Sequence, residues 1–303
     1  MRGKWYRALL RMRTNIAQVL AINQRNLRYV YTYNPRRHFP VADDKSLTKA
    51  LLARHGISVP ETYAVYQWFY QLARLPGDLD GIDEFVIKPA GGRGGGGIQV
   101  VTRLDSGRFQ SGGEILGWGE LRQHLADILF GVYSSGYTDR AIIEERLHPH
   151  HRLKKLSPFG LPDIRILLWR EQPALAMLRI PTRRSRGKAN LHQGAIGVGI
   201  GLAHGITTHA IAGTQRIVDH PDTGERLIPF TIPCWQETVS LAVAAARQVH
   251  LKYLGVDISI TDTGPRILEL NARPGLQIQL ANQTGLRSIL AQLEAESPAD
   301  DEL

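Results

Sequence analysis

The order of apolar and polar residues along the chain predicts a mixture of helices and strands. Apolar residues at helical spacing predict helices over residues 14–30, 43–57, 66–75, 119–133 and 235–252, and after residue 284. Short apolar runs predict extended or strand segments at 58–66, 84–89, 97–101, 141–147, 163–170, 173–181, 194–202, 255–260 and 265–273. Because several neighbouring strands are separated only by short turns, the predicted fold class is α+β rather than a doubly wound parallel sheet.

The first two predicted helices carry further signals. In 43–57, Ser46 is expected to cap the N-terminus of the helix, and Gly56 is expected to end it. The helix at 14–30 has an apolar stripe that we expect to pack on the body of the protein. The stripe consists of Ile16, Val19, Leu20, Leu27 and Val30.

A glycine-rich stretch, FVIKPAGGRGGGGIQVV (residues 85–101), follows Lys88, and six of the seven residues from Gly91 to Gly97 are glycine. Gly92, Gly94 and Gly97 satisfy the dinucleotide-binding spacing G-x-G-x-x-G, but that motif requires a helix to follow, and here a β-branched run follows. A phosphate-binding P-loop has its lysine after the glycines, not before them. The stretch therefore predicts a strand–loop–strand flap whose backbone N–H groups can fold over phosphates, with a mobile surface hairpin as the alternative.

A second stretch, GVDISITDTGPRILELNARPG (residues 255–275), reads as a hairpin. If its turn centres on Thr263, then Asp257 and Glu269 lie directly opposite each other. Asn271 and Arg273 are expected on the same face as Glu269, because strand side chains alternate. Two carboxylates and an amide oxygen suit Mg²⁺ shared with phosphates. An exposed hairpin with solvated acids is the alternative.

Cationic and amide side chains lie between these two stretches. Asp163 and Arg165 are expected on one strand face, and Arg179 ends the next strand. Lys188 and Asn190 precede a glycine-rich turn. Each of these residues alone is a common surface residue, but together with Lys88 and the predicted hairpin they suit a triphosphate.

Composition limits the classes of protein that fit. The apolar share of 43% and the charged share of 21% are those of a globular protein, and no apolar run approaches the roughly 20 residues that span a bilayer. A single cysteine, Cys234, fits a reducing compartment, so a cytoplasmic location is expected. We interpret Cys234 as a packed residue and HPHH (His148, His150 and His151) as a solvated loop rather than a metal site.

The positive charge is concentrated at the N-terminus. Residues 1–40 contain nine Lys and Arg and no acidic residue, whereas the remaining 28 basic and 28 acidic residues balance. We expect this segment to capture an anionic partner, with contact to an anionic membrane surface as the second interpretation. A nucleic-acid-binding protein would also explain residues 1–40, but not the other motifs.

Taken in order, these motifs resemble those of ATP-grasp carboxylate–amine ligases, and most closely the RimK-type α-L-glutamate ligases. The resemblance covers roughly residues 43–285 and rests on DDKSLTKALLARHGI, FVIKPAGGRGGGGIQVV, IIEERL, DIRI, GKANLHQGA, GVDI and LELNARPG. It implies an ATP-grasp fold, in which two α+β subdomains clasp ATP, here behind a short, basic and helical N-terminal segment. The implied division is a segment at 1–42, a first subdomain at 43–147 and a second at 148–303.

The resemblance also implies roles for individual residues. The residues expected to bind ATP are Lys45, Lys88, Gly92, Gly94, Gly95, Glu144, Glu145, Leu147, Asp163 and Lys188. Glu144, Glu145 and Leu147 match the hinge strand whose backbone meets adenine. The implied magnesium ligands are Asp257, Glu269 and Asn271, and the implied catalytic residues are Arg165, Arg179, Asn190 and Arg273.

The resemblance implies ATP as a substrate and Mg²⁺ as the cofactor, with two ions expected and Mn²⁺ as an alternative metal. Such ligases phosphorylate a carboxylate with ATP, and an amine then attacks the acyl phosphate to give an amide. The expected partners are therefore a carboxylate and an amine acceptor, which is an amino acid, a peptide or a protein, and a homo-oligomer is left open. A non-catalytic ATP-binding module is the alternative function.

Overall fold

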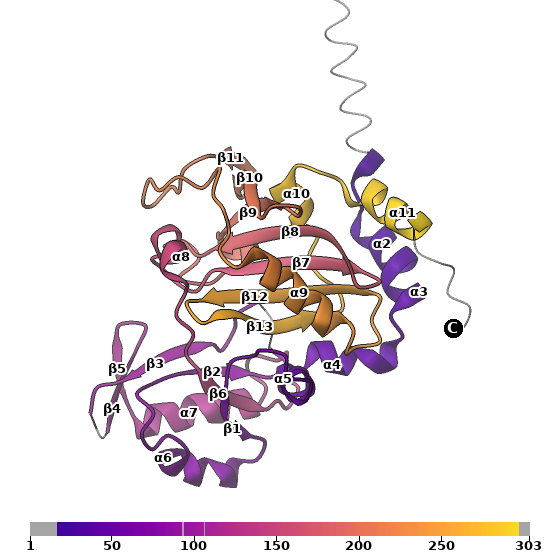
Figure 1. Ribbon diagram of the computed structural model, residues 1–303. Helices are drawn as coiled ribbons and strands as arrows, with labels where there is room; N and C mark the ends of the chain where they lie inside the picture. Colours follow the sequence, from indigo (N-terminus) through magenta and orange to yellow (C-terminus); the bar gives the residue numbers. More distant parts are fainter. Residues whose placement is uncertain (1–16, 93, 106, 297–303) are drawn as a thin grey trace, which may run out of the picture.

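The computed structural model describes residues 17–92, 94–105 and 107–296. The chain forms two antiparallel sheets, the first from β1 to β6 and the second from β7 to β13 (Figure 1). The first sheet has six strands in the order β1-β6-β2-β3-β4-β5. Its strands are β1 (Thr62–Tyr66), β2 (Glu84–Pro89), β3 (Gln99–Arg103), β4 (Arg108–Ser111), β5 (Glu114–Gly117) and β6 (Ala141–Glu145).

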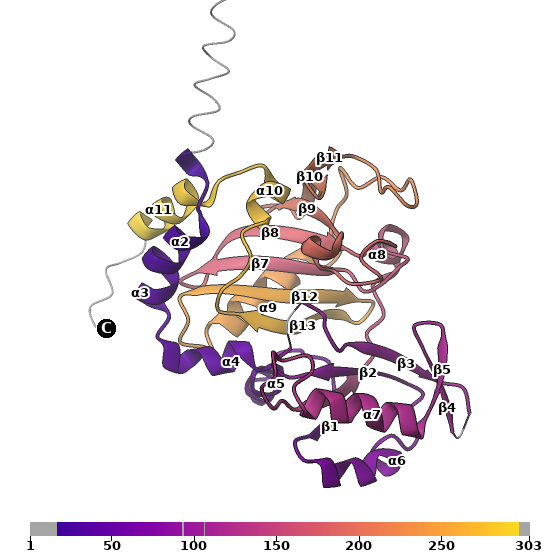
Figure 2. The same ribbon diagram turned by 180° about the vertical axis from the view of Figure 1, so that it is seen from behind.

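Three helices pack against the first sheet. They are η3 (Phe69–Arg74), α6 (Leu75–Asp78) and α7 (Trp118–Leu129). The apolar stripe of α7, which includes Leu121, Leu125 and Ile128, is fully buried against Phe85 and Ile87 of β2. Figure 2 shows α7 lying along this sheet. This small core fixes the strand that carries Lys88.

The second sheet has seven strands in the order β11-β10-β9-β8-β7-β12-β13. Its strands are β7 (Asp163–Trp169), β8 (Gln172–Ile180), β9 (Ile196–Gly201), β10 (Ile206–Ala212), β11 (Gln215–Ile217), β12 (Tyr253–Thr261) and β13 (Gly264–Asn271). Every residue of β12 is buried, as is typical of an apolar strand in the interior of a sheet. Helix α9 (Trp235–Ala246) crosses one face of the sheet (Figure 1).

Short helices complete the protein around these sheets. They are η4 (Leu191–Gln193), α8 (His151–Leu156), α10 (Ile278–Asn282) and α11 (Leu286–Glu296). Helix α8 directly follows the segment 146–150, which connects the two sheets. The predicted helix at 235–252 ends earlier than expected, at Ala246, because the chain must turn before it enters β12.

The N-terminal segment is a series of short helices rather than the single helix predicted at 14–30, although helical backbone is continuous from Ile22 to Tyr33. It comprises α2 (Ile22–Arg25), the π-helical η1 (Asn26–Val30), α3 (Tyr31–Tyr33), η2 (Arg36–His38) and α4 (Phe39–Asp43). The extended backbone of Ala21 interrupts the helix, and residues 14–16 lie outside the described part of the chain.

The segment packs on the second sheet, as expected, but not through all of the predicted stripe. Leu20 and Val30 are buried, whereas Val19 and Leu27 are exposed. Tyr29, which the stripe did not include, packs edge-on against Trp169 with ring centroids 5.2 Å apart. Aromatic packing at the end of β7 therefore sets the orientation of this segment.

Helix α5 (Lys45–Arg54) begins two residues after the start of the predicted range 43–57. Its N-cap is Asp44, whose carboxylate accepts hydrogen bonds from the backbone N–H groups of Ser46 (2.9 Å) and Leu47 (3.1 Å). The prediction that Ser46 caps the helix is wrong, since its hydroxyl instead donates to Asp44 at 2.7 Å. Gly56, with a φ of +67°, ends the helix as predicted.

Two hairpins were not predicted from the sequence. They are β4–β5 and β10–β11, and both have many exposed positions, so their apolar alternation is weak. Within the described residues, no helix has both the length and the apolar character needed to cross a membrane.

Candidate functional site

The hairpin β12–β13 brings Asp257 and Glu269 opposite each other, as predicted. The predicted reason was incomplete. Asp262 and Thr263 form a two-residue turn, so the pairing near it joins Ile258 to Ile267. Next to that pair the register shifts by one residue, and this bulge moves Glu269 into line with Asp257.

Asp257 is buried, with 1% of its side chain exposed, and two guanidinium groups hold it. Arg165 of β7 donates from Nε to Oδ1 at 2.7 Å and from Nη2 to Oδ2 at 2.6 Å. Arg179 of β8 donates from Nη2 to Oδ2 at 2.7 Å. Burial opposes the charge of Asp257, but the two arginines outweigh it and hold its pKa well below the usual range.

Asp163 completes this buried network on β7. It accepts hydrogen bonds from Nε and Nη2 of Arg179, the latter at 2.7 Å. Burial raises the pKa of Asp163, and the nearby charge of Asp257 adds to this against the opposing effect of Arg179. Asp163 therefore orients Arg179 rather than presenting a free carboxylate, which differs from its predicted contact with ATP.

Glu269 and Asn271 are the more accessible members of the predicted metal set. The Glu269 side chain is 30% exposed and its Oε2 lies 3.4 Å from Nζ of Lys45. Asn271 Nδ2 lies 3.4 Å from Glu269 Oε1 and 3.3 Å from Asp257 Oδ2. These hard oxygen donors fit Mg²⁺. Since the guanidinium groups already occupy both oxygens of Asp257, its role as a ligand stays a prediction.

Lys88 lies at the end of β2 and is buried beside Glu144 of β6, with 2.7 Å between Nζ and Oε1. Lys49 of α5 binds the other carboxylate oxygen and also donates to the backbone carbonyl of Pro60 at 3.1 Å. Burial opposes the charge of Glu144, but Lys88 and Lys49 outweigh it and lower its pKa. Burial and the charge of Lys88 lower the pKa of Lys49 to about 8.

The glycine-rich loop leaves the first sheet and contacts helix α5 and the segment that precedes β9. Lys45 Nζ donates to the carbonyl of Gly92 at 2.6 Å. The carbonyl of Gly94 accepts from Gln193 Nε2 at 2.8 Å, with Asn190 Nδ2 at 3.4 Å. The loop therefore bridges the two sheets, between the cations of one and the carboxylates of the other.

The conformation of the loop requires glycine at particular positions. Gly94 and Gly95 have φ of +65° and +77°, in the left-handed region. A Cβ on Gly95 would lie 3.2 Å from Cδ of Lys188, so Lys188 passes directly over the loop. A Cβ on Gly92 would lie 2.2 Å from Cγ of Pro89, which excludes any larger residue.

The far end of the loop is fixed to α7 and to the segment that follows it. The ring of His124 contacts the carbonyl of Gly97 through Nε2 at 2.9 Å. The Tyr133 ring lies so close that a Cβ on Gly97 would be 2.7 Å from it. At the near end, Asp139 accepts from the backbone N–H of Gly91 at 3.0 Å. These contacts hold the loop at both ends.

A small pocket of about 60 Å³ has both arginines, Arg165 and Arg179, in its wall. It combines cationic, amide and apolar side chains, and its lining residues are Arg165, Met177, Arg179, Asn190, Leu191, His192, Gly275 and Gln277. Its volume suits a carboxylate group rather than a nucleotide.

The three residues predicted at the hinge strand, on β6 and just after it, have different surroundings. The Glu145 carboxylate accepts from the backbone N–H of Glu61 at 3.1 Å, and Leu147 is buried just beyond the strand. Glu144 directs its side chain to the two lysines, so its part in the site is electrostatic. Whether this strand meets adenine stays a prediction.

Arg273 does not join the hairpin cluster. It lies beyond the end of β13, where it pairs with Asp43 at 3.1 Å and covers the ring of Phe39. The prediction that it shares the face of Glu269 is therefore wrong. The alternation of strand side chains could not be extended past Asn271, the last strand residue.

Two residues in the site were missed by the sequence analysis. Lys49 is one helical turn after Lys45, so a helical projection would have placed both lysines on one side of α5. Gln193 follows Asn190 in the same loop, but no spacing rule ties either residue to Gly94. Its contact with the glycine loop depends on how the two sheets face each other.

Comparison with known proteins agrees with this architecture. A sequence model of the family described as sugar-transfer associated ATP-grasp matches residues 24–295. A protein of Trichodesmium erythraeum (strain IMS101), described as "Probable alpha-L-glutamate ligase", is 24% identical over 256 residues, or 84% of this chain and 64% of that protein. The chain thus spans less than two thirds of that relative's length.

Solved structures that the chain resembles include D-cycloserine synthetase DcsG, at 17% identity over 88% of this chain and 74% of that chain, with a TM-score of 0.49. Another is ATP-grasp ligase PsnB complexed with a minimal precursor, at 19% identity over 98% of this chain and 75% of that chain, with a TM-score of 0.46. The predicted α+β ATP-grasp fold and the resemblance to ATP-grasp carboxylate–amine ligases are confirmed. The chain belongs to the sugar-transfer associated ATP-grasp family.

Proposed function

We propose that the protein is an ATP-dependent, ADP-forming carboxylate–amine ligase. The observation that carries this proposal is the meeting of two charge clusters under one glycine loop. Lys45 and Lys88 stand on one side, and Asp257, Glu269 and two arginines stand on the other. Family membership supports the same reaction class.

In this proposal ATP lies between the two sheets, with its phosphates under the loop Gly91–Gly97. Lys45, Lys88 and Lys188 supply positive charge to the phosphates. The backbone N–H groups of the loop add donors that need no side chain. Glu269 and Asn271, with Asp257 beside them, would hold Mg²⁺, for which two ions are expected, and the metal would supply charge neutralisation for the triphosphate.

The proposed reaction has two steps. The substrate carboxylate attacks the γ-phosphorus of ATP, which forms an acyl phosphate and releases ADP. The neutral amine of the acceptor then attacks the acyl carbon, the C–O bond to phosphate breaks, and an amide, inorganic phosphate and a proton are released. Closure of the glycine loop would keep water from hydrolysing the acyl phosphate.

The small pocket beside the arginines is the proposed place for the carboxylate substrate. Arg165 and Arg179 lie at its wall with their orientation fixed by Asp257 and Asp163. A guanidinium group held in this way can bind a carboxylate and then the charge that develops on the transferred phosphoryl group. Asn190 joins the pocket to the loop, since it touches both.

We also propose the division into two subdomains at about residues 147 and 148, in the segment that connects the sheets. Capture of an anionic acceptor by residues 1–13 stays a prediction, because these residues lie outside the described part of the chain. Acceptors with several carboxylates, such as glutamate or acidic peptides, would match the positive charge of the basic segment.

The experiment that tests the proposal is a screen for stimulated ADP release. The full chain is incubated with ATP and Mg²⁺, and amino acids and acidic peptides are added singly and in pairs. The proposal expects a pair that raises ADP release together with an amide product detected by mass spectrometry. Tight ATP binding without release by any pair would instead favour a non-catalytic ATP-binding module.

A further inference from the structure

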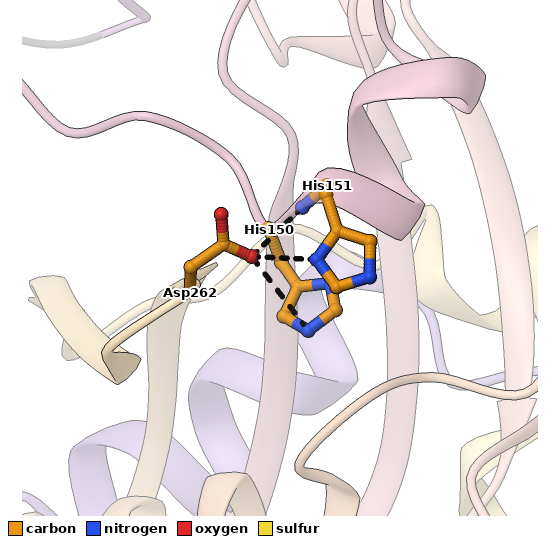
Figure 3. Close-up of side chains that lie close together, drawn as sticks. All are labelled: His150, His151 and Asp262. Carbon is orange, nitrogen blue, oxygen red and sulfur yellow. Dashed lines mark hydrogen bonds and ion pairs between the residues drawn. The ribbon is translucent and has the colours of Figure 1, made fainter.

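Three metal-ligating side chains meet at a place far from the proposed active site. His150 and His151 stand at the start of α8, and Asp262 stands in the turn between β12 and β13 (Figure 3). The turn and the helix are 111 residues apart in sequence, so only the fold brings them together.

The donor atoms face one another. Oδ1 of Asp262 lies 2.8 Å from Nδ1 of His151 and 3.9 Å from Nε2 of His150. The two imidazole rings are stacked, with centroids 4.2 Å apart. One atom from each of the three residues lies within 4.8 Å of the other two.

Backbone contacts hold these side chains in place. The N–H of His150 donates to the carbonyl of Ile260 at 2.8 Å, and the N–H of His151 donates to Oδ1 of Asp262 at 3.0 Å. The turn itself is closed by Thr261, whose hydroxyl donates to the carbonyl of Gly264 at 2.9 Å. Helix and turn therefore present their ligands from two anchored backbones rather than from free loops.

We propose that His150, His151 and Asp262 form a binding site for a divalent transition-metal ion of the Zn²⁺ class. Zn²⁺ binds histidine nitrogen and carboxylate oxygen at about 2.0–2.2 Å, so its ligand atoms lie roughly 3–4 Å apart. The observed separations of 2.8 and 3.9 Å lie close to this range, and small side-chain rotations complete the site.

The ligand chemistry separates this site from the proposed magnesium site. Two imidazoles and one carboxylate suit Zn²⁺, Ni²⁺ or Co²⁺, whereas Mg²⁺ prefers oxygen ligands. The site is also distant, because Asp262 comes five positions after Asp257 and just beyond the end of β12, which is about 16 Å at the rise of a strand. His151 and Asp262 are 72% and 63% exposed, so water can fill the remaining coordination positions.

Metal binding has one local cost. His150 is the N-cap of α8, because its Nδ1 accepts a hydrogen bond of 3.2 Å from the backbone N–H of Arg152. A neutral imidazole that binds metal through Nε2 carries its proton on Nδ1, so this cap must be given up. Loss of a single cap is a small cost compared with the binding of the ion by two histidines and a carboxylate.

The position of the site links metal binding to the stability of the folded protein. A metal ion there would tie the segment 146–150, which joins the two sheets, to the turn of the hairpin that carries Asp257 and Glu269. The bound ion would stabilise the folded protein in proportion to its occupancy.

The test uses the full chain without nucleotide or Mg²⁺, so its result does not depend on the proposed ligase function. Thermal unfolding is recorded in EDTA and with increasing Zn²⁺, and Co²⁺ binding is followed by its visible absorption. The expected result is a rise in Tm with Zn²⁺ and a Co²⁺ spectrum with nitrogen ligands. His151→Ala and Asp262→Asn should each weaken binding about tenfold or more.

Because His151 and Asp262 are exposed, their replacement should leave the fold intact. The matched control is His148→Ala, which removes a neighbouring histidine that contacts Glu84 instead at 2.7 Å. This variant should keep the metal response of the unaltered protein. An equal Zn²⁺ response in His151→Ala, Asp262→Asn and the unaltered chain, or no response in any of them, would overturn the proposal.

Discussion

Lys88 and Glu144 form a buried ion pair, with 2.7 Å between Nζ and Oε1, and each residue is only about one-twentieth exposed. Lys49 takes the other oxygen of the same carboxylate. Two buried cations therefore share one buried anion, and the group carries a net positive charge when all three are ionised. An incoming phosphate would supply the missing negative charge.

This balance predicts opposite effects on stability for two substitutions. Lys49→Met leaves one cation paired with one anion, so the free energy of unfolding should be unchanged or slightly higher. Glu144→Gln leaves two buried lysines without an anion and should lower the free energy of unfolding by roughly 3–5 kcal/mol. Urea unfolding at neutral pH measures both, and the reverse order of stabilities would contradict this account of the cluster.

The same cluster predicts a loss of ATP affinity in Lys49→Met. Without Lys49, Glu144 neutralises Lys88 and the positive field at the phosphates falls, so the Kd for ATP should rise about tenfold. The measurement is a nucleotide titration at constant ionic strength. Lys155→Met, which removes an exposed lysine from α8, is the matched control and should bind ATP normally. Equal affinities in the two variants would refute a phosphate-directed charge at Lys49.

Stability should also depend on pH through Lys49, whose pKa is lowered to about 8 from 10.5 by burial and by Lys88. Between these two values the unfolded chain holds a proton that the folded protein has released. Raising the pH through this window therefore favours the folded state. Relative to Lys49→Met, the free energy of unfolding should increase by about 2 kcal/mol from pH 7.5 to 9.5. Parallel pH profiles for the two proteins would show that Lys49 is not perturbed.

The glycine loop predicts a position-specific effect on turnover. Gly95→Ala places a side chain at a φ of +77° and against Lys188, which should disfavour the observed loop conformation by about 1 kcal/mol. Turnover should fall about fivefold, with ATP affinity changed less. Gly119→Ala in α7, where nothing lies within 4 Å of the added Cβ, is the control and should be neutral. Equal turnover in both variants would argue against a loop that acts by its conformation.

Glu269→Gln tests the metal set without changing the size of the side chain. Glu269 is the accessible carboxylate of the hairpin, so its loss should abolish Mg²⁺-dependent ADP release, while circular dichroism and Tm remain those of the unaltered protein. Arg273→Gln is the control, since Arg273 pairs with Asp43 outside the cluster and should affect turnover little. Mg²⁺-dependent release at the normal rate in Glu269→Gln would exclude Glu269 as a ligand.

The sequence predicted the parts of this site that local patterns determine. A turn centred on Thr263 between two apolar strands predicted that Asp257 and Glu269 lie opposite each other. The glycines followed by a β-branched run predicted a loop between strands. The bulge beside Glu269 could not be predicted, because it changes the register by one residue without a distinct sequence signal.

Contacts between distant segments were beyond local patterns. Glu144 was assigned to a hinge strand, but its pairing with Lys49 joins residues 95 positions apart and depends on how α5 packs beside the sheet. In the same way, HPHH was interpreted as a solvated loop because nothing in the sequence places Asp262 next to it. The N-cap of α5 could not be chosen from the sequence either. Asp44 and Ser46 both have a strong capping tendency, and Asp44 is the residue that caps the helix.

The central claim is that ATP activates a carboxylate as an acyl phosphate, and oxygen-isotope transfer tests it most directly. A carboxylate substrate found by the ADP-release screen is labelled with ¹⁸O on both oxygens and converted to the amide in unlabelled water. Attack by the carboxylate on the γ-phosphorus requires that one ¹⁸O atom leaves with phosphate for each amide formed. Mass spectrometry of the inorganic phosphate should show this single label, and amide formation with unlabelled phosphate would contradict the account.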